Sequence, residues 1–135
     1  MGYKAKSSLA GLAALALVYG SYFLWALAPG HTAHDDLAHM VGAAIGLTII
    51  LIILEIIIAV RDRSPAARVD ERDSIVGLRS ARNGYYALVG MIWWVPIVAL
   101  LGAPAVLLAN LSLGMLVLAE MVHFGSRVIY DRVGG

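Results

Sequence analysis

Residues 37–60 read LAHMVGAAIGLTIILIILEIIIAV, an apolar run with one acidic side chain, Glu55, and no basic one. A helix needs about 20 mostly apolar residues to cross the hydrocarbon core of a bilayer, because each residue adds about 1.5 Å to its length. Arg61 follows the run directly and ends it. The stretch therefore predicts a transmembrane helix rather than a helix of a soluble domain.

Three further segments have the length and apolar character of a span or approach it. They cover residues 8–28, 85–101 and 105–129. The chain is 61% hydrophobic and 14% charged, whereas a soluble domain is about 45–50% apolar and about 25% charged. We therefore expect an all-α polytopic membrane protein, in which residues 1–135 form one bundle of four transmembrane helices and the first helix is retained rather than cleaved as a signal peptide.

The basic residues indicate how the chain is oriented. All of them fall in three short stretches: Lys4 and Lys6, then Arg61, Arg63, Arg68, Arg72, Arg79 and Arg82, then Arg127 and Arg132. The two tight breaks between helices, 29–36 and 102–104, contain none. Because basic residues near the ends of spans stay on the cytoplasmic side, both termini and the loop 61–83 are predicted to lie inside a prokaryotic cytoplasmic membrane. The same bias favours a parallel arrangement of any homo-oligomer.

The loop 61–83 is the only sizeable segment outside the predicted spans. Glu71, Ile75, Leu78 and Arg82 recur at spacings of three or four, which predicts a short helix running into the third span. A net charge of +1 argues against a nucleic-acid partner, so we expect the arginines to meet anionic phospholipid or a partner protein. The candidate docking residues are Asp70, Glu71, Arg72, Arg79 and Arg82.

The third span contains Pro96, two residues after Trp94. Proline has no backbone N–H and cannot make the hydrogen bond that would continue a helix. We therefore predict a kink in this span.

Two carboxylates lie inside predicted spans, near the cytoplasmic ends. Glu55 is flanked by aliphatic residues, and Glu120 precedes His123 by three residues, so that pair shares one face of its helix. A carboxylate at this depth is costly unless it is paired or protonated. One interpretation is a proton or cation site formed by Glu55, Glu120 and His123; the other is structural hydrogen bonding to a neighbouring helix or to the inner arginines.

The first outer loop is rich in side chains that bind metals. His31, His34, Asp35 and His39 are of the types that ligate Zn²⁺ or Cu²⁺. The alternative is an exposed polar loop in which Asp35 or Asp36 caps the next helix and His39 lies at the interface. No cofactor is expected.

Two resemblances can be stated. The run Asp70-Glu71-Arg72-Asp73-Ser74-Ile75, with Arg79-Ser80-Ala81-Arg82-Asn83 before a span, resembles a loop of small uncharacterised prokaryotic membrane proteins with four helices. That resemblance implies fold and location only. The length, the four spans and the embedded glutamate also resemble small multidrug-resistance transporters in outline, but those carry the glutamate in the first helix, which here has no charge within it.

Two functions follow from these observations. The first is a non-enzymatic accessory or regulatory membrane subunit, within a homo-oligomer or larger membrane complex, that docks through its Arg-rich loop. The alternative is a small homodimeric transporter or channel that uses Glu55, Glu120 and His123 for protons or cations.

Overall fold

The structure, a computed structural model, describes residues 3–30, 32–62 and 71–133. Its helices are α1 (Tyr3–Ala26), α2 (Ala33–Asp62), α3 (Glu71–Ile92), α4 (Trp94–Leu100) and α5 (Ala105–Val133). Within the described residues, α1, α2, the α3–α4 rod and α5 make four helical segments that are long and apolar enough to cross a membrane. The predicted all-α fold with four such helices is confirmed.

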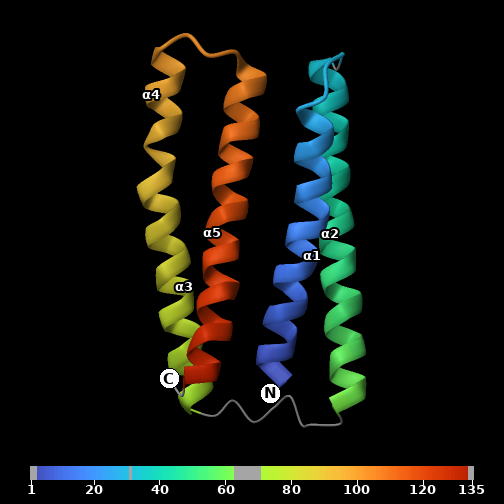
Figure 1. The fold of residues 1–135 in the computed structure, drawn as a ribbon, viewed down its shortest axis with the longest axis vertical. Helices are drawn as coiled ribbons and strands as arrows, with labels where there is room; N and C mark the ends of the chain where they lie inside the picture. The colour runs from blue at the N-terminus through green and yellow to red at the C-terminus, as the bar shows by residue number, and fades with distance from the viewer. Residues whose placement is uncertain (1–2, 31, 63–70, 134–135) are drawn as a thin grey trace.

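The helices lie side by side in the order α2, α1, α5, α3. Helix α1 packs against α2 on one side and α5 on the other, and α5 packs against α3 and α4. Figure 1 shows both tight turns at one end of the molecule, while the start of α1 and the end of α5 lie at the opposite end. The fold is therefore two helical hairpins joined by the contact between α1 and α5.

The buried core follows α1, because α1 has a neighbour on both sides. The buried residues that form it are Ala14, Leu15, Tyr19, Tyr22, Leu47 and Val117. Helix α2 packs mainly against α1 and leaves Ile45, Ile49 and Ile56 more than half exposed. A face of this kind is unfavourable in water and favourable in hydrocarbon, so the packing, like the composition, suits a bilayer.

Each tight turn contains a glycine in the left-handed backbone region. Gly30 has φ of 99° and Gly102 has φ of 84°. At the second turn Gly102 donates its N–H to the Ala99 carbonyl and Ala103 donates to the Val98 carbonyl. This paired pattern is the Schellman motif that ends many helices, and it requires a positive φ that glycine adopts without strain.

The start of helix α2 is capped by Thr32 together with Asp35, one of the two aspartates predicted to cap its first turn. The N-cap is Thr32: its hydroxyl accepts the Asp35 N–H at 3.2 Å, and Asp35 Oδ2 accepts the Thr32 N–H at 3.1 Å. This reciprocal pair is a capping box, which satisfies two backbone donors at once. Asp35 therefore stabilises the helix start from the first turn, and the helix begins at Ala33 rather than Leu37.

Much of the predicted loop 61–83 is helical. The predicted helix that runs into the third span is confirmed, because α3 begins at Glu71 and continues past Tyr85. Asp70 and its neighbours from residue 63 lie outside the described residues. The helix is interrupted at Trp93, where Pro96 has no N–H to donate to the Ile92 carbonyl. This is a local break in the helix rather than the predicted kink. Trp93 keeps helical dihedrals, φ −60° and ψ −22°, so α4 continues the direction of α3.

Candidate functional site

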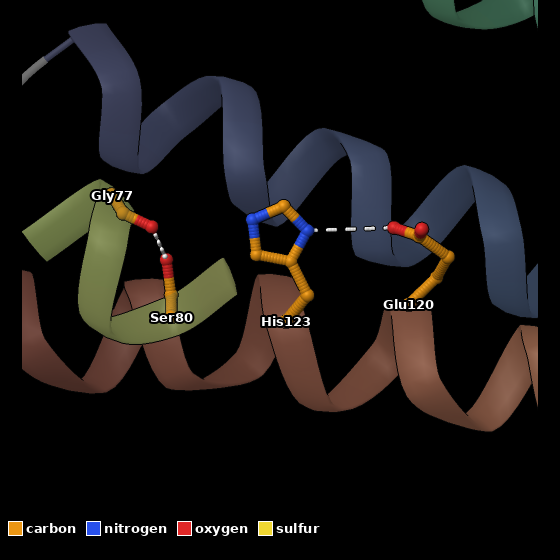
Figure 2. Close-up of polar contacts among 4 residues, drawn as sticks. All are labelled: Gly77, Ser80, Glu120 and His123. Carbon is orange, nitrogen blue, oxygen red and sulfur yellow. Dashed lines mark hydrogen bonds and ion pairs between the residues drawn. The ribbon is translucent and has the colours of Figure 1, made fainter. Parts of the chain in front are cut away.

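The Glu120 and His123 side chains meet on α5. Their three-residue spacing places both on one face, and His123 Nδ1 lies 3.4 Å from Glu120 Oε2. Figure 2 shows the imidazole and the carboxylate pointing toward each other along the helix. The Glu120 side chain is 48% exposed and that of His123 is 28% exposed. The two side chains therefore form a polar contact within one face of α5.

A cavity of about 240 Å³ opens beside this pair, between α3 and α5. It is lined by Ala81, Gly84, Tyr85, Leu88, Leu116, Ala119, Glu120 and His123. Gly84 brings the two helices together here, since a Cβ on it would lie 2.9 Å from the His123 Cβ. The buried Ser80 hydroxyl donates to the Gly77 carbonyl of its own helix at 2.9 Å (Figure 2). The cavity is large enough for a few water molecules or a small cation.

Glu55 occupies a different site. It lies on α2, and its Oε2 accepts a hydrogen bond of 2.5 Å from the Ser7 hydroxyl on α1. Helix α1 lies between α2 and α5 (Figure 1), so Glu55 and Glu120 belong to helices on opposite sides of it. The structure therefore brings Glu120 and His123 together and gives Glu55 a separate contact with a neighbouring helix.

The described side chains of the predicted outer loop make local contacts. Asp35 makes the capping box with Thr32, and His39 Nδ1 lies 3.2 Å from the Asp35 carbonyl oxygen. The His39 ring also stacks on Trp25, with ring centroids 3.6 Å apart and planes 13° apart. His31 and the side chain of His34 lie outside the described part of the structure. Within that part, no three His, Asp or Glu side chains come together as a metal site.

The N-terminal part of α3 carries an exposed basic face. Arg72, Ile75, Arg79 and Arg82 are all exposed and follow one another at spacings of three and four residues; we call these four the arginine face. The adjoining side of α3 carries the buried residues Val76, Ser80 and Gly84 and packs against α5.

Glu71 is exposed beside the arginine face, whereas Asp73 lies across α3 from it. Asp73 pairs with Lys4 of α1, and their charged atoms are 3.5 Å apart. The aspartate therefore links α3 to α1, whereas the arginine face is exposed on the outside of the bundle.

Two interhelical hydrogen-bond groups involve residues that sequence reasoning did not single out. The Tyr22 hydroxyl of α1 donates to Asn110 Oδ1 of α5 at 2.6 Å. Asn83 of α3 donates to the hydroxyl oxygens of Ser126 and Tyr130 on α5, at 3.2 and 3.0 Å. The amide side chains of Asn83 and Asn110 could have indicated these contacts in the sequence. A polar group within or beside an apolar span needs a partner from a neighbouring helix.

Comparison of the chain with protein-family models, with curated proteins and with solved structures finds no match in any of the three. The resemblance of the segment 70–83 to a loop of four-helix membrane proteins therefore identifies no family, and the site rests on its own geometry.

Proposed function

We propose that this chain is a non-enzymatic integral membrane protein, N-in and C-in, that serves as an accessory subunit and docks an acidic protein surface through the arginine face. The observation that carries this proposal is that Arg72, Arg79 and Arg82 lie together on an exposed side of α3. Within the described residues, none of them has an ion-pair partner, whereas Lys4 is paired with Asp73.

The depth of the arginine face supports docking at the membrane surface. The α3–α4 segment from Glu71 to Leu100 has 30 residues and is about 45 Å long, whereas the hydrocarbon core is about 30 Å thick. With α4 at the opposite interface, the first turns of α3 reach the lipid headgroups and the water beyond them. Arginine favours protein interfaces because its planar fork binds carboxylates in two places at once.

The test is a photocrosslinking amino acid placed at Ile75, on the arginine face, in native membranes. The expected result is a crosslink to one protein that disappears when Arg72, Arg79 and Arg82 are replaced by Gln. The matched control replaces Arg61 and Arg132, which are exposed elsewhere, and keeps the crosslink. A probe at Ile53 of α2, which is exposed to a similar extent as Ile75, should react with lipid. Crosslinks from Ile75 to lipid alone, or crosslinks that survive loss of the three arginines, would contradict docking to a protein.

The contact between Glu120 and His123 beside a cavity favours a second candidate function, movement of protons or cations by a homodimer. Under this alternative, Glu120→Gln abolishes proton-coupled flux in proteoliposomes, while Glu55→Gln preserves it because Glu55 belongs to a different contact. Absence of flux from the unmodified protein, or equal flux after Glu120→Gln, would rule the alternative out.

A further inference from the structure

The arginine face continues into the membrane-spanning part of the same rod. Its residues are spaced by three, four and three, and Tyr86, Val89 and Trp93 extend this alternation by four, three and four. Residues spaced in this way lie on one side of a helix. Trp93 keeps helical dihedrals and therefore stays in phase with α3. We call Tyr86, Val89 and Trp93 the membrane stripe.

The membrane stripe is exposed, as the arginine face is. Tyr86, Val89 and Trp93 are 63%, 37% and 68% exposed. Helices α3 and α4 lie at one edge of the row of helices and pack mainly against α5 (Figure 1). The side of the rod that carries both features is therefore exposed from the first turn of α3 to the start of α4.

The two features lie at different depths. The 30-residue segment from Glu71 to Leu100 is about 45 Å long, so a hydrocarbon core about 30 Å thick takes up about its last 20 residues. The arginine face then lies among the headgroups and water, and the membrane stripe lies in hydrocarbon. Trp93 precedes Leu100 by seven residues, or about 10 Å, which is deeper than the interfacial belt in which tryptophan usually anchors a helix.

Charge complementarity favours a different protein as the occupant of this side. A second copy packed in parallel through the same side would set the arginine face against its own equivalent, because a two-fold interface joins identical surfaces. Like charges that face each other across an interface oppose association. A helix of another protein avoids this conflict when its cytoplasmic end is acidic.

The residue types and their spacing favour a helix over lipid. Trp, Tyr and Arg are the side chains that most often dominate the binding energy at protein interfaces. Alternating spacings of three and four residues form the seam along which two helices pack at a small angle. Acyl chains can cover the membrane stripe, but they do not need such a seam.

We propose that the partner of this chain is itself a membrane protein. One of its transmembrane helices packs along the membrane stripe, and the acidic cytoplasmic continuation of that helix pairs with the arginine face. This inference rests on the proposed docking function and adds the class of the partner: an integral membrane protein rather than one held at the membrane surface.

The test is photocrosslinking in native membranes from p-benzoylphenylalanine placed at Tyr86 or at Tyr85. The two tyrosines are adjacent and each is 63% exposed, but their side chains project about 100° apart around the helix. We expect Tyr86 to capture the same protein as the probe at Ile75, and Tyr85 to react with lipid. The captured protein should stay in the membrane after an alkaline carbonate wash. Its crosslink from Tyr86 should map to an apolar segment, and its crosslink from Ile75 to acidic residues beside that segment.

A pair of tryptophan variants tests the stripe without a probe inside it. Trp93→Ala should lower the yield of the Ile75 crosslink by about tenfold, the effect of losing a central interface residue. Trp94→Ala is the matched control, because Trp94 is 58% exposed and projects about 100° away from Trp93. It should leave the yield unchanged.

The outcomes separate this inference from the docking function on which it rests. Capture of a protein from Ile75 with lipid alone from Tyr86 would overturn the inference and leave docking intact. Lipid alone from both positions would overturn both. Equal capture from Tyr85 and Tyr86, capture of a second copy of this chain, or equal effects of the two tryptophan variants would overturn the assignment of the stripe to a partner helix.

Discussion

Gly84 of α3 packs against His123 of α5 so closely that a Cβ on the glycine would lie 2.9 Å from the His123 Cβ and 3.1 Å from the Ala119 carbonyl oxygen. Both neighbours are fixed to the α5 backbone, so neither can rotate away. Close approach of helix backbones at a small residue is a common packing device in membranes, where lipid provides no hydrophobic drive between helices. The same contact brings α3 and α5 together beside Glu120.

Replacing Gly84 by Ala should therefore separate the two helices slightly. We expect the free energy of unfolding in bilayers or mild detergent to fall by about 1–3 kcal/mol, the usual cost of overpacking. The matched control is Gly90→Ala on the same helix, where an added Cβ meets nothing within 4 Å and stability should be unchanged or slightly higher. Equal stability of the two variants would show that the close approach at Gly84 is not required.

The hydrogen bond between Ser7 and Glu55 should contribute measurably to the packing of α1 on α2. Ser7→Ala removes the donor, and we expect a loss of about 1 kcal/mol in the free energy of unfolding, within the range measured for hydrogen bonds between membrane helices. Ser21→Ala is the matched control, because the Ser21 hydroxyl donates to the Leu17 carbonyl of its own helix at 2.7 Å. If both variants unfold alike, the Ser7 contact adds nothing to stability.

Tyr22 and Asn110 join the two hairpins through one polar contact, which a double-mutant cycle can isolate. Tyr22→Phe and Asn110→Leu each remove one side of the 2.6 Å hydrogen bond, and their coupling energy should be about 0.5–1.5 kcal/mol. Tyr19→Phe combined with Asn110→Leu provides the control: Tyr19 is buried on the same helix, and among the described residues its hydroxyl has no hydrogen bond to Asn110. Strict additivity of Tyr22→Phe and Asn110→Leu would argue that the hydrogen bond does not couple the hairpins.

The helices themselves could be predicted from sequence better than the way in which they pack against one another. Apolar length alone predicts the spans. The missing N–H of Pro96 predicts a kink in the third span, and the structure has a break at Trp93 instead. The sequence shows less clearly which side of each helix packs against its neighbour, because a membrane helix is apolar on every side. The Glu71, Ile75, Leu78 and Arg82 stripe is periodic, yet all four side chains are exposed, and the small residues Ser80 and Gly84 turn toward α5 instead.

The partners of the embedded polar groups could not be predicted for a related reason. Sequence shows that Glu55 needs a partner, but Ser7 can serve only because α1 is the neighbour of α2. The order of helices in the layer is a tertiary property, set by packing between segments far apart in the chain. The contact between Glu120 and His123 was accessible because both residues belong to one helix and a spacing of three residues places them on one face.

The orientation of the chain in the membrane can be measured directly, because the sequence contains no cysteine. A single cysteine at Pro29, in the first tight turn, should react with an impermeant maleimide added to intact cells. A single cysteine at Val133, near the end of α5, should react only after the membrane is permeabilised. The reason is that the two tight turns contain no Lys or Arg, whereas the basic residues of the described helices lie toward the ends opposite these turns, and such residues are held on the cytoplasmic side. Labelling of both positions in intact cells would show that the chain inserts in two orientations, and labelling of Val133→Cys alone would reverse the proposed topology.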